Sequence, residues 1–125
     1  MSLKLSTLLV VLSLFSCGKD IPTLENIDIR KWKEDKNACL GNRLAMEASL
    51  QTEISKLKGL SEMNIIELLG RPDENELYER NQKFYTYFIS PGPACSAADT
   101  TLHRLVLRFN AMGYAQLVSI QVGEE

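Results

Sequence analysis

This chain has few of the residues and motifs on which common enzyme and metal sites are built. Its 125 residues include a single histidine, His103, and no metal-ligating or catalytic motif surrounds it. No glycine-rich phosphate loop, nucleophile elbow or HExxH motif occurs. The formal net charge is −2, without the basic excess typical of nucleic-acid binding. The sequence predicts a non-enzymatic protein with no cofactor, metal, nucleic-acid partner or small-molecule substrate, in which His103 is an ordinary strand residue.

The chain also lacks an apolar run of the roughly 20 residues that a membrane-spanning helix needs. Residues 5–15 are uncharged and follow Lys4, as the apolar region of a signal peptide follows its basic start. Leu14-Phe15-Ser16-Cys17 comes next and resembles the lipobox of bacterial lipoproteins. A small residue fits beside the bond to be cleaved, and only a thiol can carry a thioether-linked diacylglycerol. We predict a signal peptide at residues 1–16 and a lipid on Cys17.

Cysteine is scarce, and lipidation of Cys17 leaves Cys39 and Cys95 as one pair. Outside the cytoplasm disulfides persist, so we predict that these two residues are joined. Two free thiols are one alternative, and a metal pair is another that lacks further ligands. The bridge would close a long loop and contribute up to ~4 kcal/mol. Residues 17–26 are predicted to form the lipidated end and a polar tether, and residues 27–125 a single domain.

The first part of this domain has a helical pattern from Ile29 to about Leu57, preceded by Asp28 as a helix cap. Apolar residues recur on one predicted face. These residues are Trp32, Cys39, Met46, Leu50, Ile54 and Leu57. Glycine and asparagine at 41–42 weaken the middle, where a kink or a break is expected. A second, short helix is predicted to start after Ser61 and to stop at Gly70.

The second half of the chain has the twofold periodicity of strands. A short edge strand is predicted from Leu77, and a central strand over residues 84–89, which are aromatic or β-branched on both faces. Strands at Leu102–Phe109 and Tyr114–Val122 are joined by a turn in which Gly113 suits a positive φ. The predicted fold is α+β, with two N-terminal helices packed on a three- to four-stranded antiparallel sheet, an ααβββ two-layer sandwich.

Two segments resemble the SmpA/OmlA, or BamE-like, family of small outer-membrane lipoproteins. Residues 59–73 (GLSEMNIIELLGRPD) are similar to the family signature around its second helix, and residues 105–114 (LVLRFNAMGY) to its hairpin. The resemblance implies an ααβββ fold and a role in barrel assembly or envelope integrity. The longer first helix and the cysteine pair depart from the family pattern. Trp32–Asp35 and Cys39–Arg43 look more like uncharacterised Bacteroidota lipoproteins.

Binding is predicted on the sheet face that turns away from the helices. Arg104 and Arg108 alternate onto one side of their strand, and arginine and aromatic residues are enriched at interfaces. The neighbouring strand must present one of two pairs on that side, Tyr85 with Tyr87 or Phe84 with Phe88. We name Arg104, Arg108, Tyr85, Tyr87 and Trp32 as the candidate interaction face. The alternatives are arginines that only solubilise the sheet and a tryptophan that belongs to the core.

Three functions follow from these features. The first is a membrane-anchored interaction or scaffold protein of the outer membrane with an envelope protein partner, facing the periplasm or the cell surface. Gly18 favours that membrane, since the aspartate-after-cysteine retention rule of enterobacteria is not met. The second is a module that binds a small ligand, lipid or peptidoglycan fragment between helices and sheet. The third, an enzyme, would need titratable groups clustered around His103. The acids at 73–74 and 124–125 are predicted to be solvated.

We expect the native protein to begin with an acylated Cys17, because the lipobox directs cleavage before that residue. Mass spectrometry of protein purified from membranes tests this directly. A Cys17→Ser variant should leave the membrane fraction for the soluble fraction. An unmodified, uncleaved amino terminus on the native protein contradicts the prediction.

Overall fold

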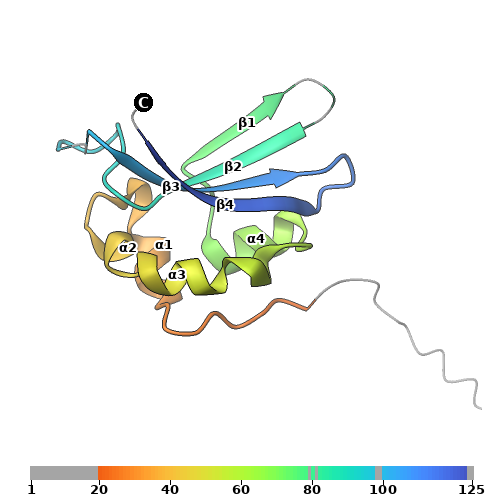
Figure 1. Cartoon of the computed structure of the whole chain (residues 1–125), viewed down its shortest axis with the longest axis horizontal. Coiled ribbons are helices and arrows are strands. Elements are labelled where there is room, and N and C mark those ends of the chain that lie inside the picture. The colour runs from red at the N-terminus through yellow and green to blue at the C-terminus, as the bar shows by residue number, and fades with distance from the viewer. Residues whose placement is uncertain (1–19, 79, 81, 98–99, 124–125) are drawn as a thin grey trace, which may run out of the picture.

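A computed structural model describes residues 20–78, 80, 82–97 and 100–123 of the chain (Figure 1). The helical segments are α1 (Ile29–Glu34), η1 (Lys36–Ala38), α2 (Asn42–Ala45), α3 (Glu47–Glu53), η2 (Ile54–Leu57) and α4 (Glu62–Leu69). The strands are β1 (Glu74–Tyr78), β2 (Gln82–Phe88), β3 (Leu102–Phe109) and β4 (Ala115–Gly123). They form one sheet in the order β1-β2-β3-β4, with antiparallel neighbours. The predicted α+β class with an antiparallel sheet is confirmed.

The helical pattern predicted from Ile29 to Leu57 is divided into five short segments. Asp28 caps the first of these as predicted, and its carboxylate accepts a hydrogen bond from the Lys31 amide at 3.2 Å. The chain then leaves helical geometry at Asn37 and at Gly41, where φ is 59° and 81°. The apolar residues therefore mark a buried strip along a bent path. Cys39, which was predicted on that strip, is exposed in the turn after η1.

The local signals in the rest of the chain are placed as predicted. The Ser61 hydroxyl accepts a hydrogen bond from the Asn64 amide at 3.2 Å and caps α4, which ends at Gly70 with φ 82°. Gly113 has φ 84° in the turn between β3 and β4. The bounds of β3 match the prediction, whereas β1 begins at Glu74 and not at Leu77.

The helices lie on one face of the sheet (Figure 1), and the main core fills the space between them. From the chain before α4 it takes Leu24, Ile27, Trp32, Leu50, Leu57 and Leu60. From the sheet it takes Tyr85, Tyr87, Leu105, Leu107 and Phe109. Leu24 is 4% exposed, and the Glu25 amide donates to the Glu53 carboxylate at 3.2 Å. The packed part therefore begins before residue 27, inside the segment predicted to be tether.

Cys39 and Cys95 form the predicted disulfide, with their Cα atoms 5.4 Å apart. The bond joins the turn after η1 to the loop that follows β2. Beside it Ala38, Phe88 and Leu102 form a second buried cluster. The loop passes close over this cluster, since a Cβ on Gly92 would lie 2.8 Å from the Phe88 ring. The loop therefore covers one end of the sheet on the side opposite the main core.

We expect a Cys39→Ser/Cys95→Ser variant to lose up to about 4 kcal/mol of unfolding free energy, because the bond closes a loop with a sequence separation of 56. Urea unfolding under oxidising conditions measures the loss. Reduced wild-type protein is the matched control and should unfold at the same urea concentration as the variant. A variant as stable as the oxidised wild type contradicts the expected contribution.

Candidate functional site

The strand register defines which side chains lie on the sheet face opposite the helices, because residues directly across an antiparallel pair share a face. Phe84 lies opposite Arg108, and Thr86 opposite Val106. We call this surface the outer face. It carries Glu74, Glu76 and Tyr78 from β1, Gln82, Phe84 and Thr86 from β2, Arg104, Val106 and Arg108 from β3, and Leu117, Ser119 and Gln121 from β4. It therefore has an acidic edge strand and a basic inner strand.

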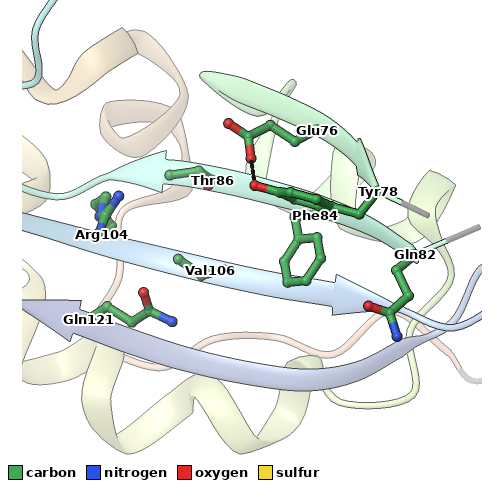
Figure 2. A pocket seen from close by; sticks show the side chains of 8 residues that line it. All are labelled: Glu76, Tyr78, Gln82, Phe84, Thr86, Arg104, Val106 and Gln121. Atoms are coloured by element: carbon green, nitrogen blue, oxygen red, sulfur yellow. Dashed lines mark hydrogen bonds between the residues drawn. The ribbon is translucent and has the colours of Figure 1, made fainter. Parts of the chain in front are cut away.

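An open hollow of about 690 Å³ lies on this face (Figure 2). Its lining residues are Glu76, Tyr78, Gln82, Phe84, Thr86, Arg104, Val106 and Gln121. We call it the outer hollow. Figure 2 shows Arg104 and Gln121 toward one end, and Tyr78 and Gln82 toward the other. The hollow thus crosses all four strands, with the positive charge of Arg104 at one end and the carboxylate of Glu76 on its β1 side.

Tyr78, the last residue of β1, lines the β1 side of the outer hollow. Its ring meets the Phe84 ring edge-on, with centroids 5.0 Å apart. Its hydroxyl donates a hydrogen bond to the Glu76 carboxylate, and this bond raises the pKa of the Tyr78 phenol above its usual value. The phenol therefore stays protonated in neutral solution and acts as the hydrogen-bond donor to Glu76.

Arg104 and Arg108 lie on the outer face as predicted. Neither guanidinium makes a hydrogen bond or ion pair with any residue that the structure describes, and both Nε atoms are buried without an acceptor. A guanidinium carries five N–H donors, and leaving such donors unpaired costs free energy. These two cations can therefore accept an anionic or hydrogen-bond-accepting ligand without giving up an internal partner.

The prediction that Tyr85 and Tyr87 belong to the interaction face is wrong. The two tyrosines are 4% and 0% exposed and point into the core. Their hydroxyls donate to Glu62 at 2.9 Å and to the Gly70 carbonyl at 2.7 Å. Burial, helped by the bond to Glu62, raises the pKa of Tyr85 to about 12, and burial also raises the pKa of Tyr87. The alternative pair lies on the outer face instead, with Phe84 in the hollow and Phe88 beneath the loop.

Trp32 is also not part of an interaction face, because its side chain is fully buried in the core. Its ring lies 6.3 Å from the Tyr87 ring. The Arg43 guanidinium also lies against Trp32, 4.7 Å from the centroid of its ring, in a cation–π arrangement. The tryptophan therefore supports a buried charge and has no free surface for a membrane or partner.

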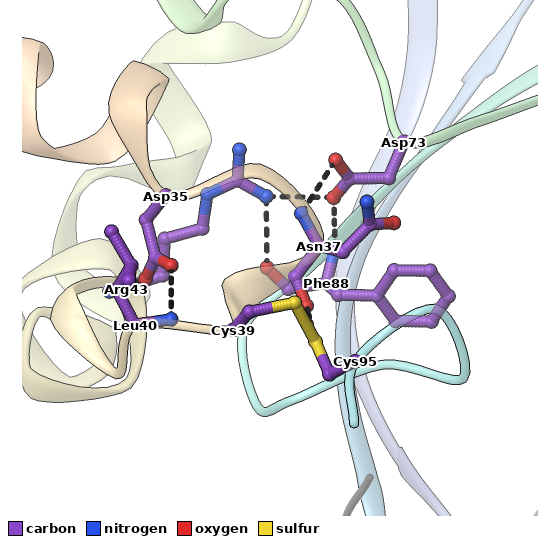
Figure 3. Close-up of a disulfide and its surroundings, with 8 residues drawn as sticks. All are labelled: Asp35, Asn37, Cys39, Leu40, Arg43, Asp73, Phe88 and Cys95. Carbon is purple, nitrogen blue, oxygen red and sulfur yellow. Dashed lines mark hydrogen bonds and ion pairs between the residues drawn. A yellow bond between two sulfur atoms is a disulfide. The ribbon is translucent and has the colours of Figure 1, made fainter. Parts of the chain in front are cut away.

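Arg43 is the centre of a buried polar cluster that sequence reasoning missed (Figure 3). Arg43 is 1% exposed. Its Nε donates to the Trp32 carbonyl at 2.9 Å, and its Nη1 donates to the Phe88 carbonyl at 3.1 Å. The same Nη1 lies 2.6 Å from an Asp73 carboxylate oxygen. No local pattern signals this burial, because the partners lie far away in the sequence.

The prediction that Asp73 is solvated is wrong, since its side chain is 3% exposed. Besides Arg43, its carboxylate accepts hydrogen bonds from the Asn37 amide at 3.0 Å and the Phe88 amide at 2.8 Å. Asp35 is fully buried nearby and holds the Arg43 amide at 2.9 Å. The groups of this cluster are engaged with one another, and they join the segments before α4 to the sheet.

His103 lies at the other side of β3, toward the helices. Its Nδ1 lies 2.6 Å from a Glu47 carboxylate oxygen, and its side chain is partly buried. The described part of the chain contains no group of three histidine, cysteine or acidic residues that could hold a metal. The contact joins β3 to α3.

Several predictions fall outside the described residues, among them the signal peptide, the lipid on Cys17 and the acids at 124–125. No helix within the described ranges has both the length and the apolar character needed to cross a membrane. Comparison of the chain with protein-family models, curated proteins and solved structures finds no match. The resemblance to SmpA/OmlA proteins therefore stays a prediction based on two short segments.

We expect Arg43→Met to lower the free energy of unfolding by about 3–5 kcal/mol, because it leaves the Asp73 carboxylate buried without its cation. Arg30→Met is the matched control, since Arg30 is largely exposed and its ion-pair partner among the described residues is the exposed Glu34. It should change the free energy by about 0.5 kcal/mol or less. Urea unfolding measures both variants. An Arg43→Met/Asp73→Asn variant should recover part of the loss, and no recovery would show that the uncompensated charge is not the cause.

Proposed function

We propose that this chain is a lipid-anchored, non-enzymatic interaction module of the bacterial envelope, held at the outer membrane by Cys17. Its binding surface for a protein partner is the outer face. The observation that carries the proposal is the asymmetry of the sheet. Helices cover one face, whereas the other is hollowed and presents Arg104 and Arg108 without partners among the described residues. Unpaired arginine beside aromatic side chains is typical of surfaces that bind proteins.

The disulfide supports the proposed compartment. Bonds such as Cys39–Cys95 persist outside the cytoplasm and are rare within it. The predicted lipobox would bring the chain to that environment. Within it, the covalent link gives a small domain stability that a limited core supplies only in part.

We also propose that the fold is a variant of the ααβββ arrangement of SmpA/OmlA proteins. In this view the segments from α1 to η2 stand in place of one helix, and α4 is the second. The capped ends of α4 at Ser61 and Gly70 and the turn at Gly113 support it, since they lie in the two similar segments. A role in barrel assembly or envelope integrity would follow from that kinship.

A second candidate function is the binding of a small ligand, which the size of the outer hollow favours. Its volume of about 690 Å³ lies within the ~300–1,000 Å³ of small-molecule sites. This site would lie on the opposite side of the sheet from the pocket predicted between helices and sheet. A ligand of this kind would raise the melting temperature of the protein, and the rise would increase with the logarithm of the free ligand concentration above Kd.

The proposed function is tested by photocrosslinking in living cells. A photoreactive amino acid at Ser119 lies on the outer face and leaves both arginines in place. We expect it to capture a discrete envelope protein, and we expect Arg104→Glu/Arg108→Glu to abolish the product. The same group at Met63, an exposed position on α4, is the control and should not capture that protein.

Crosslinks that persist after charge reversal, or that form equally from Met63, would contradict the outer face as the binding surface. Recovery of a barrel-assembly subunit would support the family role. Recovery of a different envelope protein, with the same dependence on the arginines, would support the interaction module and contradict that role.

A further inference from the structure

The outer hollow carries opposite charges at positions that are too far apart to pair with each other. Glu76 on β1 lies opposite Phe84, and Arg104 on β3 lies opposite Phe88. Glu76 and Arg104 are therefore separated by two strand spacings across the sheet and by four residues along it. With strands ~4.8 Å apart and a rise of ~3.3 Å per residue, their Cα atoms are about 16 Å apart. At that distance salt largely screens their attraction, so both charges remain available to a ligand.

Between these charges the floor of the hollow is mostly uncharged. Phe84, Thr86 and Val106 form its middle, and the amide side chains of Gln82 and Gln121 lie toward its ends. An extended peptide presents every second side chain to one side, so it can place an apolar residue on this floor and a charged residue on each flank. A small anion would use only Arg104 and leave the rest of the hollow unfilled.

We propose that the outer hollow binds an extended peptide segment of a partner protein, with a carboxylate on Arg104 and a cationic side chain, four residues away, on Glu76. This inference rests on the proposed function and names the chemistry of its partner. Four residues of extended chain span about 13 Å, and the long side chains of the peptide close the remaining distance. Tyr78 beside Glu76 adds an aromatic ring that a cation can approach.

An anionic membrane surface fits the outer face less well. Glu74 and Glu76 lie on the same face as the two arginines, so they repel phosphate groups that the arginines attract. The loop over Phe88 and Leu102 stands on this side of the sheet and interrupts a flat approach. A peptide that carries both signs of charge can pair with Glu76 on β1 and with Arg104 on β3 at the same time.

The test uses the purified full chain and fluorescent nine-residue peptides, with binding measured by anisotropy at low salt. The mixed-charge peptide is GSKTVTEGS. Its controls replace the two charged residues by two glutamines, two glutamates or two lysines. We expect the mixed-charge peptide to bind at least fivefold tighter than each control, and we expect added salt to weaken it.

Variants of the protein test the two ends of the hollow separately. Arg104→Glu and Glu76→Lys should each weaken the mixed-charge peptide at least threefold. The double variant should restore binding, because the peptide then fits with its direction reversed. Arg30→Glu, on α1 and away from the outer face, is the control and should leave affinity unchanged. Thermal unfolding monitored by circular dichroism verifies that each variant folds.

Two results overturn the proposal. One is equal or tighter binding of the two-glutamate peptide, with displacement of peptide by vesicles that contain anionic lipid, which would make the hollow a general anion surface. The other is no binding of any peptide. Crosslinking at Ser119 in cells remains a separate measurement. A product that depends on the arginines, together with failure of the peptides, would overturn this inference and leave the proposed function standing.

Discussion

The ion pair between Arg43 and Asp73 joins the helical layer to the sheet, and the rest of the fold is arranged around it. The helical segments before α4 are too short to be stable alone, so their positions depend on what they pack against. Arg43 reaches from α2 to the Phe88 carbonyl, and Asp73 holds the Phe88 and Asn37 amides. A buried pair contributes little net stability. Its constraint here is geometric, since moving α2 away from the sheet would leave the buried Asp73 carboxylate without its cation.

The disulfide acts at the same junction and closes it from the opposite side of the sheet. It links the turn after η1 to the loop after β2, beside the cluster of Ala38, Phe88 and Leu102. One end of the sheet is therefore held on both faces. The outer hollow begins where this cover stops, and its lining side chains come from all four strands, β1 to β4.

The features predicted correctly from the sequence are those that a few neighbouring residues determine. The caps at Asp28 and Ser61, the turn at Gly113 and the span of β3 depend on local backbone preferences. The cysteine pair was predicted because few alternatives remained. The choice of Tyr85 and Tyr87 over Phe84 and Phe88 was wrong, because β2 is aromatic on both faces and its local pattern does not distinguish the buried face from the outer one. The burial of Arg43 depends on Asp73 and Phe88, 30 and 45 positions away, which no local pattern reports.

The side chains of Arg43 and Asp73 also occupy backbone groups at the edge of the sheet beside Phe88. Strand β1 is short, and its pairing with β2 ends at Glu74 and Thr86. Phe88, the last residue of β2, would otherwise present a backbone amide and a carbonyl without partners at this edge. Asp73 and Arg43 take these two groups in the way that a further strand would. Exposed strand edges recruit other chains and promote aggregation. Because Asp73 and Arg43 occupy the backbone amide and carbonyl of Phe88, this part of the sheet edge offers no template to a neighbouring chain.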